Sequence, residues 1–189
     1  MPFLRYKLSK GLIMLKYIFI IIVGFACYKT FFSTDTKSEP SWSEVYSDEH
    51  KFQVQFPHQP KEEFKQVNLP GLGKIELTSY IIRSPELTCT VIISDYKGQA
   101  EVLGSVYDVI DVARRDLLKG FGGSITKEDY IYNQNVSGYE FYMLTNNNKL
   151  LQSRVYKYEN KAYNLTCQYK ENEVNRNKVN QLMQSFTFI

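Results

Sequence analysis

Histidine and cysteine are the residues of this chain with the widest chemical repertoire. Only two histidines occur, His50 and His58. Histidine is the usual general acid or base at neutral pH, but a catalytic histidine needs a neighbouring group that orients it. His50 follows an Asp-Glu pair in a predicted turn, and His58 stands between a proline and a Gln-Pro pair. We therefore expect both histidines in solvated loops.

The chain has three cysteines, Cys27, Cys89 and Cys167. Cys89 and Cys167 lie on the apolar sides of two predicted strands, which leaves two interpretations. They form a disulfide if the domain lies outside the cytoplasm, or they are unpaired small hydrophobic residues of the core. A catalytic cysteine is disfavoured, because no histidine follows with a recognisable partner.

Known catalytic and metal-binding spacings are not found in the sequence. Zinc-type spacings of His and Cys are missing, as are the nucleophile-elbow, metalloprotease and phosphate-loop patterns. Residues 71–74 read Gly-Leu-Gly-Lys and precede a strand rather than a helix, which predicts a hairpin turn. Residues 120–123, Gly-Phe-Gly-Gly, are typical of a helix exit. The sequence thus predicts no catalytic residue, no cofactor-binding residue and no metal ligand.

Composition and charge exclude several further classes. Hydrophobic residues make up 43% and charged residues 23% of the chain, which fits neither wholesale disorder nor a multi-span membrane protein. The net charge is only +3, and four basic residues near the N-terminus supply much of it. No basic cluster follows residue 38, so we expect no binding of nucleic acid.

Residues 1–32 are predicted to direct the chain to a membrane. An apolar run of about 12 residues, 17–28, follows Arg5, Lys7, Lys10 and Lys16, and it is shorter than the roughly 20 residues that span a bilayer. Lys16 and Lys29 can snorkel and lengthen it, so a signal peptide and a retained anchor are both open. Basic residues ahead of the run predict a cytoplasmic N-terminus and a domain on the non-cytoplasmic side, periplasmic or extracellular.

Lipidation is a third alternative for this segment. Met14 is an alternative start to Met1, because Met-Leu-Lys followed by the apolar run has the layout of an export signal. Cys27 then follows Ala26, where a bacterial lipoprotein signal places its lipidated cysteine, although Gly24 and Phe25 depart from that pattern. A buried core helix is the remaining interpretation of the same run.

The rest of the chain is predicted to be one α+β domain, residues 42–189, after a polar linker, residues 33–41. Alternating or continuous apolar runs predict strands, and apolar residues at helical spacing predict two helices. The strands are 52–56, 74–83, 87–96, 138–145, 150–158, 161–169 and a short closing strand 185–189; the helices are 105–119 and 173–184. We expect an antiparallel sheet covered by these two helices, with an N-terminal membrane-directing helix.

Several short strings resemble small bacterial envelope domains of the PsbP-like superfamily. They are Phe-Gln-Val-Gln-Phe-Pro at 52–57 with Pro60, Ser-Gly-Tyr-Glu at 137–140, Arg-Val-Tyr at 154–156 ahead of Tyr163, and Ser-Phe at 185–186. The resemblance spans roughly residues 42–189 around the long amphipathic helix. It implies a domain that acts mainly by binding partners, and it transfers no site residue, because members of the superfamily share no single functional site.

These observations favour a non-enzymatic, membrane-tethered or exported envelope protein. Its α+β domain would bind a protein, as yet unknown, or another envelope component, and the N-terminal segment would contact the membrane. Two alternatives stay open: an envelope enzyme of the hydrolase type, and a domain that binds a small ligand.

Overall fold

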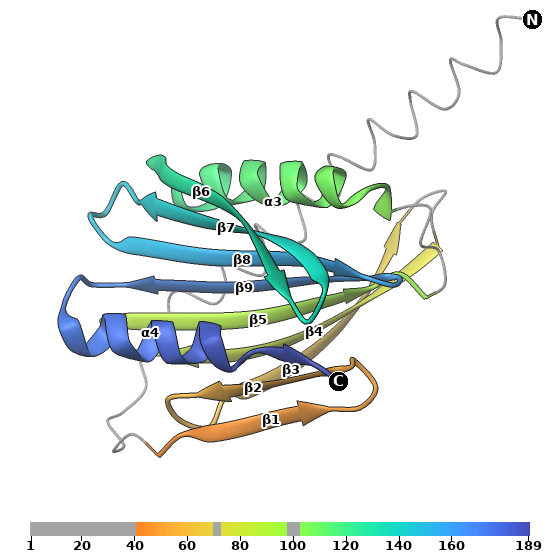
Figure 1. Cartoon of the computed structure of the whole chain (residues 1–189), viewed down its shortest axis with the longest axis horizontal. Helices are drawn as coiled ribbons and strands as arrows, with labels where there is room; N and C mark the ends of the chain where they lie inside the picture. Colours follow the sequence, from red (N-terminus) through yellow and green to blue (C-terminus); the bar gives the residue numbers. More distant parts are fainter. Residues whose placement is uncertain (1–40, 70–72, 98–102) are drawn as a thin grey trace, which may run out of the picture.

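A seven-stranded antiparallel sheet dominates the part of the chain that the computed structural model describes, residues 41–69, 73–97 and 103–189 (Figure 1). Its strand order is β3-β4-β5-β9-β8-β7-β6. The strands are β3 (Lys61–Leu69), β4 (Gly73–Arg83), β5 (Leu87–Asp95), β6 (Ser124–Asn133), β7 (Val136–Leu144), β8 (Leu150–Tyr158) and β9 (Lys161–Tyr169). Because β5 lies centrally and is buried along its whole length, its sequence is a near-continuous apolar and β-branched run.

A second, smaller sheet joins the two ends of the described chain. It consists of β1 (Ser43–Ser47), β2 (Phe52–Phe56) and β10 (Thr187–Phe188), with β2 in the middle. Figure 1 shows it beside β3, with the C-terminus next to β2. Phe188 pairs with Phe52 in register, and Phe186 stacks on Phe52 with ring centroids 5.7 Å apart. Much of the aromatic content of the chain gathers in this part of the core.

Helix α3 (Val106–Phe121) begins and ends at local sequence signals. The Ser105 hydroxyl accepts a hydrogen bond from the Asp108 backbone N–H at 3.3 Å, and the Asp108 carboxylate accepts one from the Ser105 N–H at 2.7 Å. These reciprocal bonds form a capping box. The helix ends at Gly122, whose φ of 62° lies in the left-handed region that favours glycine.

The two helices cover opposite faces of the main sheet. Alternate residues of a strand point to opposite faces. On one side, which we call the α3 face, α3 packs on β8 and β7. On the other, the α4 face, α4 (Glu173–Ser185) packs on β9 and β2. Asn172 caps α4, since its side chain accepts a hydrogen bond from the Asn175 N–H at 2.8 Å.

The predicted α+β class, the antiparallel sheet and both helices are confirmed, as is the hairpin of β4 and β5. The predicted closing strand is shorter than expected, because Ser185 still belongs to α4. Three strands were not predicted, β1, β3 and β6. Strands β3 and β6 are the outer strands of the main sheet and carry several charged side chains, so they lack the apolar alternation of a half-buried strand.

The predicted membrane-directing segment, residues 1–32, and nearly all of the predicted linker lie outside the described residues. Within the described ranges, no helix combines the length and the apolar character needed to cross a bilayer.

Candidate functional site

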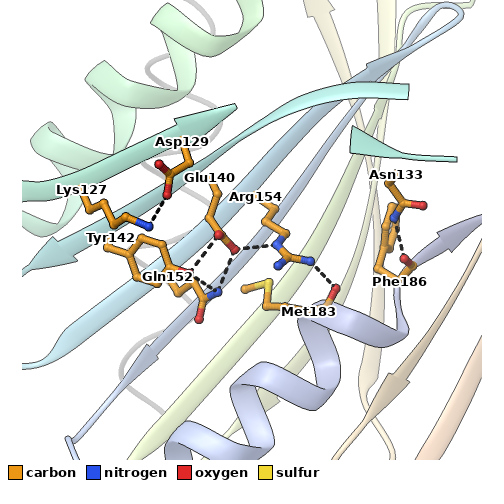
Figure 2. A network of polar contacts seen from close by, with 9 residues as sticks. All are labelled: Lys127, Asp129, Asn133, Glu140, Tyr142, Gln152, Arg154, Met183 and Phe186. Carbon is orange, nitrogen blue, oxygen red and sulfur yellow. Dashed lines mark hydrogen bonds and ion pairs between the residues drawn. The ribbon is translucent and has the colours of Figure 1, made fainter. Parts of the chain in front are cut away.

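A network of polar side chains surrounds Glu140 on the α4 face (Figure 2). Glu140 is only 6% exposed, and its carboxylate accepts three hydrogen bonds. The donors are Arg154 Nε at 2.6 Å, Gln152 Nε2 at 2.8 Å and the Tyr142 hydroxyl at 2.9 Å. Strand register brings them together, since Glu140 lies opposite Arg154 and Tyr142 lies opposite Gln152 on β7 and β8.

This network holds Glu140 in its ionised form. Burial by itself would raise the pKa of Glu140, but the hydrogen bonds from Arg154 and Gln152 and the charge of Arg154 outweigh it, and the pKa lies below its usual value. Burial, followed by the hydrogen bond to Glu140, raises the pKa of Tyr142 to about 12. Both carboxylate oxygens already have donors. Glu140 is therefore poorly suited to act as a general acid or base near neutral pH.

The network also fixes the end of α4. Arg154 Nη1 donates to the Met183 carbonyl oxygen at 2.7 Å, and Asn133 Nδ2 donates to the Phe186 carbonyl oxygen at 2.6 Å. The last carbonyls of a helix have no partner within the helix, so these side chains satisfy groups that would otherwise be unpaired. Figure 2 shows both contacts at the junction of α4 and the C-terminal strand. The network therefore serves the structure.

A second group of titratable side chains lies where β5 ends and β9 begins. Asp95 Oδ2 is 3.7 Å from Lys161 Nζ and 3.8 Å from Lys97 Nζ, and Asn160 Nδ2 donates to Asp95 Oδ1 at 3.0 Å. Asp95 and Lys161 are 5% and 8% exposed. The charges of this group act on the His50 ring.

The prediction that His50 lies in a solvated loop is wrong, since the residue is only 6% exposed. The Tyr163 hydroxyl donates to the His50 carbonyl oxygen at 2.8 Å and holds the turn between β1 and β2 against the sheet. Burial is the main reason that the pKa of His50 is lowered, and among the described residues Nδ1 of its ring has no hydrogen-bond partner. His58 is half-buried, with its Nδ1 3.3 Å from the Gln59 carbonyl oxygen.

Cys89 and Cys167 lie directly opposite each other on the central strands β5 and β9. In this structure they form a disulfide, with Sγ atoms 2.08 Å apart, and both residues are fully buried on the α4 face. Cys27, the candidate lipidation site, lies outside the described residues.

Four tyrosines lie at the β6 edge of the α3 face, three of them exposed and Tyr139 half-buried, and we call them the tyrosine surface: Tyr107, Tyr130, Tyr132 and Tyr139. The rings of Tyr107 and Tyr130 are 6.2 Å apart and those of Tyr130 and Tyr139 are 4.7 Å apart, both edge to face. Tyr107 is 63%, Tyr130 47% and Tyr132 73% exposed. Sequence analysis missed this surface, because it needs α3 and the unpredicted strand β6 side by side.

In the described part of the chain, no three His, Cys, Asp or Glu side chains are placed to hold a metal ion together. Of the predicted hairpin turn at 71–74, residues 71 and 72 lie outside the described residues, and Gly73 and Lys74 belong to β4, which pairs with β3 as far as Leu69 and Gly73. The predicted helix exit at 120–123 is confirmed by the C-cap at Gly122.

Comparison with known proteins adds information on the fold. No protein-family model and no curated protein matches the chain. Among solved structures, the solution structure of cyanobacterial PsbP (CyanoP) from Synechocystis sp. PCC 6803 is similar at a TM-score of 0.50 and 14% identity, over 83% of this chain and 98% of that one. PA94, a Pseudomonas aeruginosa protein of unknown function, aligns at a TM-score of 0.40 and 10% identity, over 76% and 94% of the chains.

The domain therefore has a PsbP-like fold, as the short strings in the sequence suggested. At this level of identity the similarity shows the fold alone.

Proposed function

We propose that this chain is a non-enzymatic protein of the cell envelope, whose PsbP-like domain binds another protein through the tyrosine surface. The observation that carries the proposal is the grouping of Tyr107, Tyr130 and Tyr132 in the open beside an edge strand. Scattered exposed aromatic residues are ordinary, but contiguous ones from two elements mark interaction sites.

Tyrosine suits a protein interface for physical reasons. It offers a large contact area, loses little conformational entropy and keeps a hydroxyl for hydrogen bonds at the rim. In the tyrosine surface the rings of Tyr107, Tyr130 and Tyr139 already support one another edge to face, so they are partly ordered before binding. A partner that covers these rings therefore meets a preformed surface.

Two observations support a location of the domain outside the cytoplasm. A disulfide between Cys89 and Cys167 is typical of proteins in an oxidising compartment outside the cytoplasm. The basic residues ahead of the apolar run 17–28 favour the same side of the membrane. We therefore propose a domain on the non-cytoplasmic side, attached to or exported across the membrane by residues 1–32.

Affinity capture of the full-length protein from lightly crosslinked native membranes tests the proposal. The test variant is Tyr107→Ala with Tyr132→Ala, and the matched control is Tyr46→Ala on β1, which is as exposed as Tyr107, 63% in each case. Central aromatic residues of an interface each contribute more than about 1 kcal/mol, so we expect the double variant to bind the captured protein at least about tenfold more weakly.

The control should capture the same protein as the wild type. If the double variant retains the partner as well as Tyr46→Ala does, the tyrosine surface is not the binding site. If the wild type enriches no protein at all, the proposal fails as a whole.

A further inference from the structure

Strand β6 is the last strand of the main sheet, next to β7 (Figure 1). Among the described residues, no strand pairs with its outer edge. Glu128, Tyr130 and Tyr132 of this strand are exposed, whereas Asp129 and Ile131 between them are half-buried. The backbone groups on the outer side of an edge strand are free to pair with another chain. The question is which residues present them.

The turn between β6 and β7 decides which backbone groups face the outer edge. It has two residues, Gln134 and Asn135, with φ of 46° and 69°, and Asn133 pairs with Val136 across it. Positive φ at both central residues is the mark of a type I′ hairpin turn. The pair that flanks a two-residue turn exchanges both backbone hydrogen bonds, and along the ladder such pairs alternate with pairs that exchange none.

The alternation directs the backbone of three residues outward, and we call them the open residues: Glu128, Tyr130 and Tyr132. Asp129 and Ile131 bond to β7, so the N–H and carbonyl groups of the open residues point away from β7. The rings agree with this assignment. Tyr130 lies opposite Tyr139, and their centroids are 4.7 Å apart, as expected for a pair without hydrogen bonds, whose side chains approach closely.

The open residues form a stretch that is symmetric about Tyr130. On one side, a β-bulge between Ile125 and Lys127 interrupts the ladder, and Thr126 Oγ1 donates to a carbonyl oxygen of β7 at 3.1 Å. On the other side, the turn begins at Gln134. Thr126 and Gln134 are each four residues from Tyr130. A bulge limits the pairing of an edge strand, so a strand that pairs here has this stretch available to it.

A second copy of β6 fits this stretch in antiparallel orientation. When Tyr130 lies opposite Tyr130 of the second copy, Glu128 lies opposite Tyr132, and each open residue meets an open residue. A shift of the register in either direction leaves at least one open residue without such a partner. The symmetric spacing of the open residues thus selects one register, with a twofold axis at Tyr130.

The charges of β6 favour the same arrangement. On the α4 face, this register sets Lys127 opposite Asn133 and Asp129 opposite Ile131, so no like charges are opposed. A parallel, in-register arrangement would instead set Lys127 beside Lys127 and Asp129 beside Asp129 of the second copy. Like charges directly opposite each other are destabilising. The charged half of the strand therefore disfavours the parallel alternative.

The size of the tyrosine surface also suits a pair of copies. The open area of Tyr107, Tyr130 and Tyr132 is about 400 Å², roughly half of the area that one partner contributes to a stable interface. Pairing through the edge uses backbone groups and leaves the rings on the α3 face, because side chains point out of the plane of a sheet. Two paired copies therefore present two tyrosine surfaces side by side.

We propose that two copies of this chain pair through their β6 edges, antiparallel about Tyr130, so that the main sheet continues from one copy into the other. The interface is short, which makes the dimer reversible. Pairing needs no further protein and is measured on the purified chain. It therefore stands or fails separately from the capture of a partner by the tyrosine surface.

Disulfide trapping in the full-length protein, purified in detergent, tests the register. Under mild oxidation Tyr130→Cys should crosslink to itself, because residues opposite each other in a hydrogen-bonded pair have Cα atoms about 5.5 Å apart, within disulfide reach. Glu128→Cys should not crosslink to itself, but it should crosslink to Tyr132→Cys when the two proteins are mixed. Tyr46→Cys on exposed β1 is the control position, and the wild type shows any crosslink through Cys27.

A proline variant tests the backbone bonds. Glu128→Pro removes an outward N–H, and proline is tolerated on an edge strand where the N–H faces outward. The matched control, Glu128→Ala, loses the same side chain and keeps the N–H. In sedimentation velocity, the wild type and Glu128→Ala should form dimers as concentration rises. Glu128→Pro should dimerise at least about tenfold more weakly, because the twofold axis doubles the loss.

Circular dichroism checks that both variants are folded, and the trapping result does not depend on them. A wild-type protein that stays monomeric at every concentration would overturn the proposal. So would self-crosslinking of Glu128→Cys as efficient as that of Tyr130→Cys, or a folded Glu128→Pro that dimerises as well as Glu128→Ala.

Discussion

Removing the disulfide between Cys89 and Cys167 should take away a large share of the stability of the domain. The two cysteines are 78 residues apart in sequence. In the chain-entropy account, a crosslink that closes a loop of this size lowers the entropy of the unfolded chain by about 15 cal/mol/K, which is about 4.5 kcal/mol at 25 °C. Domains of this class are stable by only about 5–15 kcal/mol, so we expect Cys89→Ala with Cys167→Ala to fold marginally.

Urea unfolding measures this effect, followed by circular dichroism and by the fluorescence of Trp42, the single tryptophan. With a slope of about 2 kcal/mol/M, the midpoint of the double variant should fall by about 2 M. Cys89→Ala alone should cost nearly as much as the double change, because either substitution breaks the bridge.

Thiol titration of the unfolded, unreduced wild-type protein is the independent check. At most one thiol, that of Cys27, should react. Three reactive thiols would show that the bridge does not form. A urea midpoint that moves by less than about 0.5 M in the double variant would show that loop closure does not stabilise this fold.

Two further predictions concern buried carboxyl groups. Glu140→Gln leaves the Arg154 guanidinium without its carboxylate and should destabilise the domain by about 3 kcal/mol at pH 7. Because the folded pKa of Glu140 is lowered, its contribution to stability is present above the unfolded pKa and is lost as pH falls through the folded pKa. In denaturant melts, the difference in unfolding free energy between variant and wild type should therefore close in acid, and a constant difference would contradict this. Burial raises the pKa of Asp116 to about 7, so the folded state favours the protonated carboxyl and loses stability as pH rises from about 4 to about 7. Asp116→Asn should therefore be more stable than the wild type by about 1–3 kcal/mol at pH 8 and nearly equal to it at pH 4, and equal melting temperatures at pH 8 would refute the reasoning.

Local signals made the helices and central strands predictable. Helix α3 has apolar residues at helical spacing, a capping box from Ser105 to Asp108 and a glycine exit, all within a short stretch of sequence. Strand β5 is buried on both faces, and its apolar and β-branched run shows it, whereas β9 alternates apolar with polar residues. Where a helix or strand depends on sequence neighbours or on full burial, the spacing of apolar and capping residues in the sequence identifies it.

The outer strands, the network around Glu140 and the burial of His50 depend on pairing between residues far apart in sequence, and the spacing of apolar residues does not predict such pairing. β6 reads Ser-Ile-Thr-Lys-Glu-Asp before its tyrosines, because charged residues on an edge strand hinder unwanted pairing with other chains. Glu140 gains its role only through the register that sets Arg154 opposite. His50 lies in a turn, as its sequence neighbours predicted, but the hydroxyl of Tyr163, 113 residues away in sequence, donates to its carbonyl oxygen and holds that turn against the sheet.

The small sheet has a consequence for the order of events during synthesis. Its middle strand, β2, lies early in the sequence, whereas its neighbour β10 is Thr187–Phe188, far along the sequence. The Ile189 N–H donates to the Lys51 carbonyl oxygen at 3.2 Å. Phe186 and Phe188 complete the aromatic core around Phe52. This core can therefore close only after residues 186–188 have emerged from the ribosome.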